Sequence, residues 1–252
     1  MKQTPAYTVL FADEALVVLN KKSGLLTAAD RYDAEAPRVD TAAEAEFGRL
    51  FAVHRLDRDT SGAVIYARTA QAHQLLCAQF ENRQVTKIYH ALINGRPAWK
   101  QFRADSPLLP DGDARHRTVV SKRHGKPSQT DFTCLGSCGM FSWIEARPLT
   151  GRTHQIRAHL AEQHLSIVCD PLYGGSIKPV RLSDIKRSWK GDPFEERPLL
   201  SRLALHAYRI EFAHPLTEEA LAVTAPYPKD MDAVRKQLAK LFGPDPLAVI
   251  QA

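Results

Sequence analysis

The chain has 252 residues, 44% of them hydrophobic and 25% charged, which is ample for a sizeable core and typical of a globular protein. No apolar run reaches the ~20 residues that span a bilayer, and residues 1–14 lack the apolar centre of a secretory signal, so we expect a cytoplasmic protein. The net charge of +6, from 34 basic and 28 acidic residues, and the isoelectric point near 9.2 favour an anionic partner such as nucleic acid.

The N-terminal part of the chain is predicted to contain strands and one clear helix. Residues 7–20 are expected to form two short strands around an Asp-Glu turn, and the Ala-rich segment 28–49 a loop with one helical turn. β-Branched and aromatic residues predict a strand over 63–68. Near-helical apolar spacing predicts an amphipathic helix over 70–82, and the alternating segment 87–94 predicts another strand.

The C-terminal part is predicted to be mainly strands with long connections. Residues 96–128 are loop-rich and basic, and two strands at 131–137 and 141–148 form a hairpin that contains glycine. The further expected elements are a helix at 153–163, an insertion at 176–200, strands at 203–213 and 220–225, and a helix at 230–241. Strands that do not alternate regularly with helices favour an α+β fold over a doubly wound one.

The cysteines and histidines do not form a recognisable metal site. Cys134 and Cys138 have a CxxxC spacing, but no second pair of ligands completes a zinc site, so we expect buried or free thiols. His54, His154 and His159 do not form an HExxH pattern, and structural roles or contacts to an anionic partner are favoured. We therefore expect no metal.

The segment VHRLDRDTSG, residues 53–62, places Asp57 between Arg55 and Arg58 just before a predicted strand. The segment is either a capped surface turn or a turn that holds a nucleophile. Short polar side chains and a glycine at its end are expected to bond backbone amides, relieve strain and aim Asp57. Ser61 lies in no GxSxG elbow, which argues against a serine hydrolase.

Two further segments carry candidate site residues. In KIYHALING, Lys87 and Tyr89 share one face of a strand because side chains alternate along it. In TGRTHQIRAHL, residues 152–154 are expected to open a helix, with Thr153 and Arg157 on one helical face and Gln155 and His159 likewise sharing a face.

These segments, in this order, resemble the pseudouridine synthases of the RluA type. The resemblance extends from VVLNKKSG near residue 17 to FAHP at 215 and includes DPLYGG, residues 170–175. It implies an α+β fold with a mixed, mostly antiparallel central sheet, flanking helices and a central cleft that holds Asp57, in a single catalytic domain over 1–252. It also implies RNA as partner and no cofactor. The sequence does not fix the oligomeric state, for which we take a monomer as the default expectation. No additional N-terminal RNA-binding domain of the kind many relatives carry is evident, so we expect loops of the catalytic domain to select the RNA.

The reaction implied by the resemblance is the isomerisation of uridine within RNA, in which the bond from uracil N1 to ribose C1′ breaks and C5 bonds to C1′. Asp57 is the expected catalytic carboxylate, either as nucleophile or as base at the sugar. By resemblance Arg157 pairs with Asp57 and keeps it charged. Tyr89 is expected to lie flat against the uracil, with its hydroxyl accepting the C5 proton; an ordinary core or edge aromatic is the alternative.

Other residues are expected to bind the RNA around the target base. They are Arg55, Arg58, Lys87, Arg152, His154 and Leu205. By resemblance Arg55 stacks in the space that the extruded base leaves; a phosphate contact is the alternative. Arg58 is expected to contact phosphate or to be a surface charge, Lys87 to support the site, touch phosphate or be solvated, and Leu205 to pack beneath the base or in the core.

The basic loop 96–128 and the insertion 176–200 are expected to grip the RNA backbone, or else to be solvated surface. Two rival functions remain at this stage. One is a non-catalytic RNA-binding or assembly factor with the same fold. The other is a hydrolase that uses Asp57, although such retaining chemistry needs a second carboxylate about 5–5.5 Å away, and none of the recognised segments supplies an obvious one. Ribosomal RNA and transfer RNA are both open as substrates.

Overall fold

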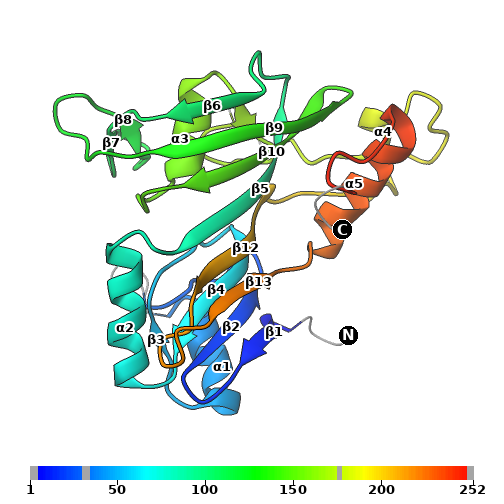
Figure 1. The fold of residues 1–252 in the computed structure, drawn as a ribbon. Helices are drawn as coiled ribbons and strands as arrows, with labels where there is room; N and C mark the ends of the chain where they lie inside the picture. Colours follow the sequence, from blue (N-terminus) through cyan, green and yellow to red (C-terminus); the bar gives the residue numbers. More distant parts are fainter. Residues whose placement is uncertain (1–4, 30–34, 175–177, 249–252) are drawn as a thin grey trace. The chain divides into compact units, whose positions relative to one another are not determined.

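The computed structural model describes residues 5–29, 35–174 and 178–248, which form two compact units (Figure 1). Unit 1 comprises residues 1–89 and 206–226, and unit 2 comprises residues 90–205 and 227–252. Parts of four expected features lie outside the described residues. They are 30–34 of the loop 28–49, 175 at the end of DPLYGG, 176–177 at the start of the insertion 176–200, and the ends of the expected domain 1–252. The single catalytic domain stays a prediction.

Unit 1 is built on a sheet with the strand order β1-β2-β4-β12, in which β3 pairs with β4 and β13 with β12 (Figure 1). The strands are β1 (Tyr7–Ala12), β2 (Leu16–Lys21), β3 (Phe51–Ala52), β4 (Ser61–Ala67), β12 (Leu205–Ala213) and β13 (Ala220–Thr224). Of the pairs described here, β4 with β12 is parallel and the others are antiparallel. The parallel pair places Ser61 opposite His206 and Gly62 opposite Ala207, so β12 fixes the last two residues of the Asp57 segment.

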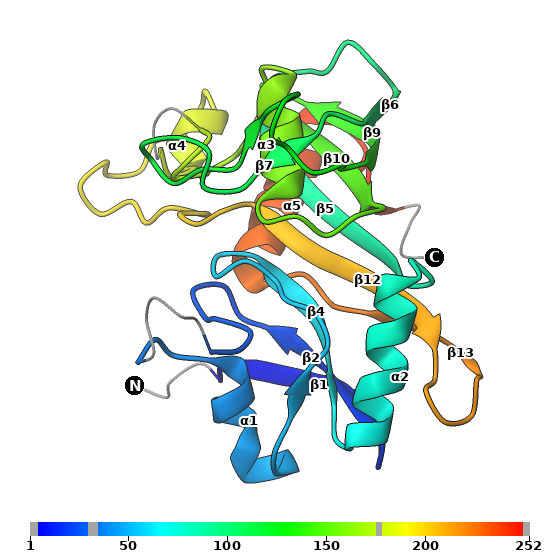
Figure 2. The ribbon, with the colours of Figure 1, turned by 90° about the vertical axis from the view of Figure 1, so that its left-hand side faces the viewer.

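Two helices cover opposite faces of this sheet, α1 (Val39–Phe47) and α2 (Ala70–Glu81) (Figure 2). Alternate residues of β2 point to opposite sides, so Leu16 and Val18 share a core cluster with α2, while Val17 and Leu19 share one with α1. All seven residues of β4 are buried, as expected for a strand covered on both faces. The sheet is therefore a rigid base for the turn that precedes β4.

Unit 2 contains a second run of strands, in the order β5-β10-β9-β6, with β11 on β5. The strands are β5 (Thr86–Asn94), which enters unit 2 at His90, β6 (Gln101–Ala104), β9 (Thr130–Cys138), β10 (Phe141–Pro148) and β11 (Ser166–Ile167), with a separate pair β7 (Leu108–Leu109) and β8 (Val119–Val120). The pairs β10–β9, β6–β9 and β11–β5 are antiparallel. The mostly antiparallel strands with few helices confirm the α+β class.

Three helices belong to unit 2: α3 (Gln155–Glu162), α4 (Leu182–Ile185) and α5 (Lys229–Phe242). Residues 155–160 of α3 are all buried, and α3 contacts β9 and β10. Side chains on every face of this part of the helix are therefore surrounded by protein. The amphipathic α5 contacts β9 and buries Met231, Val234 and Leu238. Within the described residues, no helix is long and apolar enough to cross a membrane.

Two predictions about local structure are wrong. The segment 28–49 contains the nine-residue helix α1 and not a single helical turn. The helix expected from Thr153 begins at Gln155, because His154 has φ +52, which is left-handed, so Thr153 does not share a helical face with Arg157. The other expected pair, Gln155 and His159, does share a face, since both hydrogen-bond the hydroxyl of Thr130.

Candidate functional site

Asp57 is partly buried and begins a tight turn in unit 1. Its carbonyl oxygen accepts the backbone N–H of Thr60 at 3.1 Å, which closes the turn just before β4. The next carbonyl, that of Arg58, accepts the N–H of Gly24 at 2.8 Å, and the Arg58 guanidinium Nε returns a bond to the Gly24 carbonyl at 3.3 Å. The turn is therefore tied to the loop that follows β2.

The strongest tie comes from Lys21, which is completely buried at the end of β2. Its ammonium donates to the carbonyl oxygens of Lys22, Leu25 and Arg58 at 3.1, 2.6 and 2.9 Å. A buried ammonium is stable only where its charge and its donors are satisfied, so these carbonyls must stay in place around it. Lys21 thus holds the backbone one residue after Asp57, a role that the sequence analysis missed.

Two hydroxyl groups hold the backbone on either side of Asp57. Ser23 Oγ donates to the carbonyl of Asp59 at 2.7 Å. Thr27 Oγ1 accepts the N–H of Leu56 at 3.0 Å and donates to the carbonyl of Leu56 at 3.2 Å. Side chains from residues 21–27 therefore bond the backbone of the turn and hold it in place. The aiming of Asp57 by the polar side chains of residues 59–61 stays a prediction.

Ser61 and Gly62 fix the turn to the sheet. Ser61 Oγ lies 3.0 Å from His206 Nδ1, and His206 Nε2 lies 3.1 Å from the carbonyl of Ala225. Because a carbonyl only accepts, Nε2 carries the ring proton and the serine hydroxyl donates to Nδ1. Gly62 has φ +118, and a Cβ there would lie 2.2 Å from the carbonyl oxygen of Ala207, so only glycine fits, as predicted.

Tyr89 lies near Asp57 in unit 1. Its ring is partly buried and packs against the core cluster that contains Leu56 and Ala207. Burial raises the pKa of the Tyr89 hydroxyl, and the negative charge of Asp57 raises that pKa further. Two of the predicted catalytic groups are thus within electrostatic reach of one another, and Tyr89 is a neutral phenol at pH 7.

His54 and Lys87 form a second cluster in the same unit. His54 Nε2 accepts the N–H of Ile65 at 3.0 Å, and its ring stacks on Phe80 with 4.7 Å between centroids. Burial, and then the charge of Lys87, lower the pKa of His54 to about 3, so its imidazole is neutral at pH 7. Burial lowers the pKa of Lys87 to about 8, so its ammonium loses its proton just above neutral pH.

Arg157 is held in unit 2 by a partner that the sequence analysis did not name. Its Nε and Nη2 each bond one carboxylate oxygen of Asp170 at 2.8 Å, and both side chains are buried. Burial acts to raise the pKa of Asp170, but the hydrogen bonds and charge of Arg157, with the backbone N–H groups of Tyr173 and Leu172, outweigh it and lower the pKa. This is the planar two-bond geometry in which an arginine is most firmly oriented.

The ring of Tyr173 completes the setting of Arg157. The guanidinium carbon lies 5.0 Å from the ring centroid, a cation–π contact. Asp170 and Tyr173 both belong to DPLYGG, which was the available sequence signal for them. Asp57 is in unit 1 and Arg157 in unit 2, and their pairing stays a prediction.

The side chains of the remaining RNA-binding candidates differ in their exposure and in their contacts with the rest of the protein. Arg55 is exposed in unit 1. Arg152 Nε and Nη2 lie 3.4 and 3.5 Å from the carbonyl of Pro127, and the His154 ring meets Tyr173 edge-on with 5.9 Å between centroids. Leu205 is buried, which agrees with the core-packing alternative. Their roles toward RNA stay predictions.

The cations of the basic loop 96–128 fall into two groups. Five are engaged by carboxylates or carbonyls of the protein: Arg96 by the Gly139 carbonyl, Lys100 by the Cys134 carbonyl, Arg103 by Asp131, Arg115 by the Pro171 carbonyl, and Arg117 by Asp113 and the Leu172 carbonyl. Three lie at an exposed turn for which the described residues show no ion pair, Lys122, Arg123 and Lys126. If the loop binds RNA, we expect these three exposed cations to contact the phosphate backbone.

Histidines weighed as metal ligands have protein partners. His159 Nδ1 lies 3.0 Å from the hydroxyl of Thr130, and its Nε2 lies 3.1 Å from the carbonyl of Ser106. In the part of the chain that the structure describes, no group of three or more His, Cys, Asp or Glu residues could hold a metal ion. The expectation of a metal-free enzyme stays a prediction.

The family comparison covers the segments that carry these residues. The family described as RNA pseudouridylate synthase matches residues 15–162, which include Asp57, Tyr89 and Arg157. The Dual-specificity RNA pseudouridine synthase RluA of Escherichia coli O6:H1 is 30% identical over 225 residues, covering 89% of this chain and 94% of that protein. The chain therefore belongs to the RNA pseudouridylate synthase family, and within it to the RluA type that the motifs predicted.

Two further proteins are similar along most of the chain. The Ribosomal large subunit pseudouridine synthase D of Neisseria meningitidis serogroup B is 33% identical over 238 residues, which cover 90% of this chain but 59% of that protein. The solved structure of Human RNA Pseudouridylate Synthase Domain Containing 4 covers 94% of both chains with a TM-score of 0.70 and 23% identity. The structural likeness confirms the pseudouridine synthase fold.

Proposed function

We propose that this protein is an RNA pseudouridine synthase that isomerises uridine to pseudouridine in structured RNA, with Asp57 as the catalytic carboxylate. The observation that carries the proposal is a partly buried Asp57 beside Tyr89, on a turn fixed by Lys21, in a chain of this family. The relatives named for the ribosomal large subunit favour ribosomal RNA, with transfer RNA as the other candidate. A monomeric state and a cytoplasmic location stay predictions.

The reaction needs an ionised carboxylate beside ribose C1′. Asp57 acts there either as a nucleophile, so that C1′ is held covalently while the base turns, or as a base at the sugar. The proton that leaves C5 when the new bond forms is balanced by the proton that N1 gains, so no redox partner is needed. The backbone ties at Leu56, Arg58 and Asp59 hold the main chain that carries Asp57 in place, and holding a reacting group in position lowers such a barrier.

Tyr89 is proposed to stack on the target uracil and to take part in moving the C5 proton. Because its pKa is raised, the hydroxyl is neutral at pH 7 and accepts a proton only as it passes its own proton on. Arg157 is proposed to pair with Asp57 and keep it anionic. The bidentate bond to Asp170 and the ring of Tyr173 support this role because they fix the plane of the guanidinium.

The proposal is tested with purified protein and unmodified transcripts of ribosomal and transfer RNA. We expect pseudouridine in at least one transcript, measured by nucleoside mass spectrometry after digestion. RNA binding without any pseudouridine would instead support a non-catalytic RNA-binding factor, and release of free uracil would support a hydrolase. Mapping the pseudouridines that are lost in cells without the gene then identifies the RNA.

Replacing Tyr89 with phenylalanine should slow the reaction without weakening RNA binding. The ring that stacks is kept, while the hydroxyl that moves the proton is lost, so we expect a single-turnover rate about 10²-fold lower at saturating RNA. Tyr7→Phe is the matched control, because its hydroxyl bonds Glu46 at the surface of the same unit. A wild-type rate for Tyr89→Phe would contradict the proton role.

RNA affinity should fall as the pH rises through about 8. The Lys87 ammonium is charged below its pKa of about 8 and neutral above it, so its attraction to phosphate is present below that pH and lost above it. One charged contact of about 1.5 kcal/mol corresponds to roughly a tenfold change in affinity. Fluorescence polarisation at constant ionic strength measures the RNA affinity at each pH. Lys87→Arg, which stays charged, should bind RNA equally well below and above pH 8. The same pH dependence in Lys87→Arg would show that another group titrates.

A further inference from the structure

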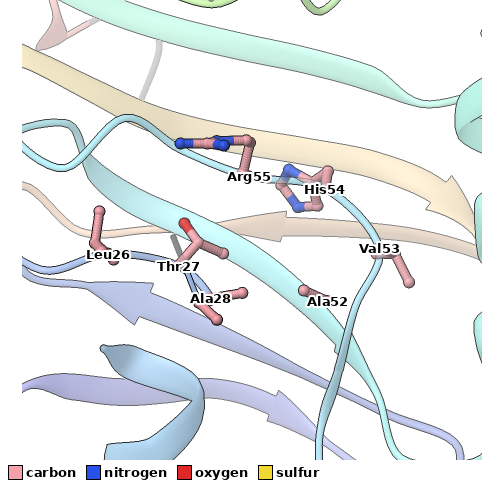
Figure 3. Close-up of a pocket in the computed structure, with 8 residues that line it drawn as sticks. Leu26, Thr27, Ala28, Ala52, Val53, His54 and Arg55 are labelled. Atoms are coloured by element: carbon pink, nitrogen blue, oxygen red, sulfur yellow. The ribbon is translucent and has the colours of Figure 1, made fainter. Parts of the chain in front are cut away.

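A hollow of about 270 Å³ lies in unit 1 beside the Asp57 turn (Figure 3). Among the residues that the structure describes, its walls come from two short segments of unit 1, 26–29 and 52–55. Figure 3 shows His54 and Arg55 along one side and the small side chains of Thr27, Ala28 and Ala52 along the other. The catalytic role proposed for Asp57 does not use this space.

The lining has the chemistry of a site for a flat heterocycle. Methyl and short aliphatic groups line much of it, from Leu26, Ala28, Ala29, Ala52 and Val53. Small side chains let a planar ring approach the backbone closely, and ligand pockets combine such apolar walls with a few polar groups that orient the ligand. The volume lies just below the roughly 300–1,000 Å³ of sites for drug-sized ligands, so it suits a single base and not a larger molecule.

The polar groups of the lining suit a nucleotide. The neutral imidazole of His54 accepts the Ile65 N–H at Nε2, so its proton is on Nδ1 and the ring offers an N–H donor. Arg55 lines the hollow and is exposed, which brings a positive charge to its edge. A base has ring acceptors for the donor, and its phosphate complements the guanidinium.

We propose that this hollow is a second nucleobase pocket, which receives the base of a nucleotide that neighbours the target uridine. The proposal rests on the proposed function, because it places the pocket beside the target site. Arg55 is two residues from Asp57, a span of at most about 7 Å of chain, which is within reach of an adjacent nucleotide. Bases in unpaired RNA are bound in this way, by stacking and by hydrogen bonds to their edges. The pocket then selects which unpaired loop the enzyme modifies.

Filling the pocket is the first test. Ala28→Leu, and Ala29→Leu as a second variant, place a larger side chain in the lining, while Ala45→Leu on the exposed side of α1 is the matched control. We expect the half-saturating concentration of the RNA transcripts to rise about tenfold in both pocket variants, the loss of one stacked base, with the single-turnover rate at saturation unchanged. Wild-type half-saturation in pocket variants with wild-type thermal unfolding would overturn the proposal.

Photocrosslinking is the second test, and its main readout uses the wild-type protein and does not depend on catalysis. The probes are ribosomal and transfer RNA transcripts that carry 4-thiouridine and 6-thioguanosine. We expect crosslinked peptides of the wild-type protein to contain residues 26–29 or 52–55, and these crosslinks to be lost in Ala28→Leu. An active wild-type protein that crosslinks only elsewhere would overturn the pocket while the proposed function stands. A protein that forms these crosslinks but makes no pseudouridine would overturn the proposed function and leave the pocket.

Discussion

Asp57→Asn should abolish pseudouridine formation while RNA binding and folding stay intact. The asparagine side chain has the shape of aspartate but lacks the charge needed at C1′, so we expect the single-turnover rate to fall by on the order of 10³-fold or more. The ties that hold the turn go to backbone groups of Leu56, Arg58 and Asp59, which the substitution does not touch. Single-turnover kinetics on the modified transcript and its half-saturating concentration measure the two effects separately.

A neighbouring carboxylate supplies the control. Asp59→Asn keeps the backbone carbonyl that Ser23 bonds, so this variant should remain active. The pKa of Tyr89 gives an independent readout by NMR of Cζ-labelled tyrosine. It should fall in Asp57→Asn, because the negative charge that raises it is gone, and remain above its ordinary value because the ring is still buried. Normal turnover by Asp57→Asn would remove this carboxylate from the mechanism.

The fold was predictable from sequence where the residue pattern of an element agrees with a turn or capping residue at its end. The hairpin of β9 and β10 turns at Gly139, which has φ +63, and it forms within one residue of the expected ranges. Buried and half-buried residues alternate along the first part of β9. Helix α2 begins where Thr69 accepts the N–H of Ala72 at 3.1 Å, an ordinary N-cap ahead of a well-spaced apolar face.

The errors lie where such signals are absent. Helix α1 follows Arg38, which makes no capping hydrogen bond from its side chain, and only Val39 and Ala43 are buried, so no apolar stripe is visible in an Ala-rich sequence. The start of α3 depends on a left-handed His154, a conformation that L-residues other than glycine adopt only in particular contexts. Tertiary contacts therefore determine both the formation of α1 and the residue at which α3 begins.

The candidate site divides in the same way. The groups expected to meet the substrate, Asp57 and Tyr89, could be named as candidates from the sequence because each belongs to a compact motif. The groups that hold them were missed because their partners are distant in the chain: Lys21 bonds a carbonyl 37 residues away, and Arg157 bonds a carboxylate 13 residues away. The spacing of residues within one segment does not reveal contacts between distant segments. In the folded structure these contacts can be recognised because each buried charge must have a partner.

Asp170→Ala should be the most destabilising single substitution at the site. It leaves the buried guanidinium of Arg157 without its carboxylate, which typically costs about 3–5 kcal/mol, and removes the acceptor of two backbone N–H groups, those of Leu172 and Tyr173. That is a large share of the roughly 5–15 kcal/mol by which domains are stable, so it should be visible as a lower urea midpoint with an unchanged slope. Asp131→Asn is the control, because its pair with Arg103 is exposed and such pairs contribute about 0–1 kcal/mol.

The pH dependence of the stability lost in Asp170→Ala tests whether the charge of Asp170 is its cause. The pKa of Asp170 is lowered in the folded protein, so its contribution is complete above the unfolded value of about 4 and is lost as the pH falls through the folded value. The difference in unfolding free energy between wild type and Asp170→Ala should therefore shrink below about pH 4. Asp170→Asn keeps an acceptor and the side-chain shape without the charge, and it should fold while turning over slowly if Arg157 must be oriented to keep Asp57 anionic. Wild-type turnover by Asp170→Asn would show that the orientation of Arg157 does not limit the reaction.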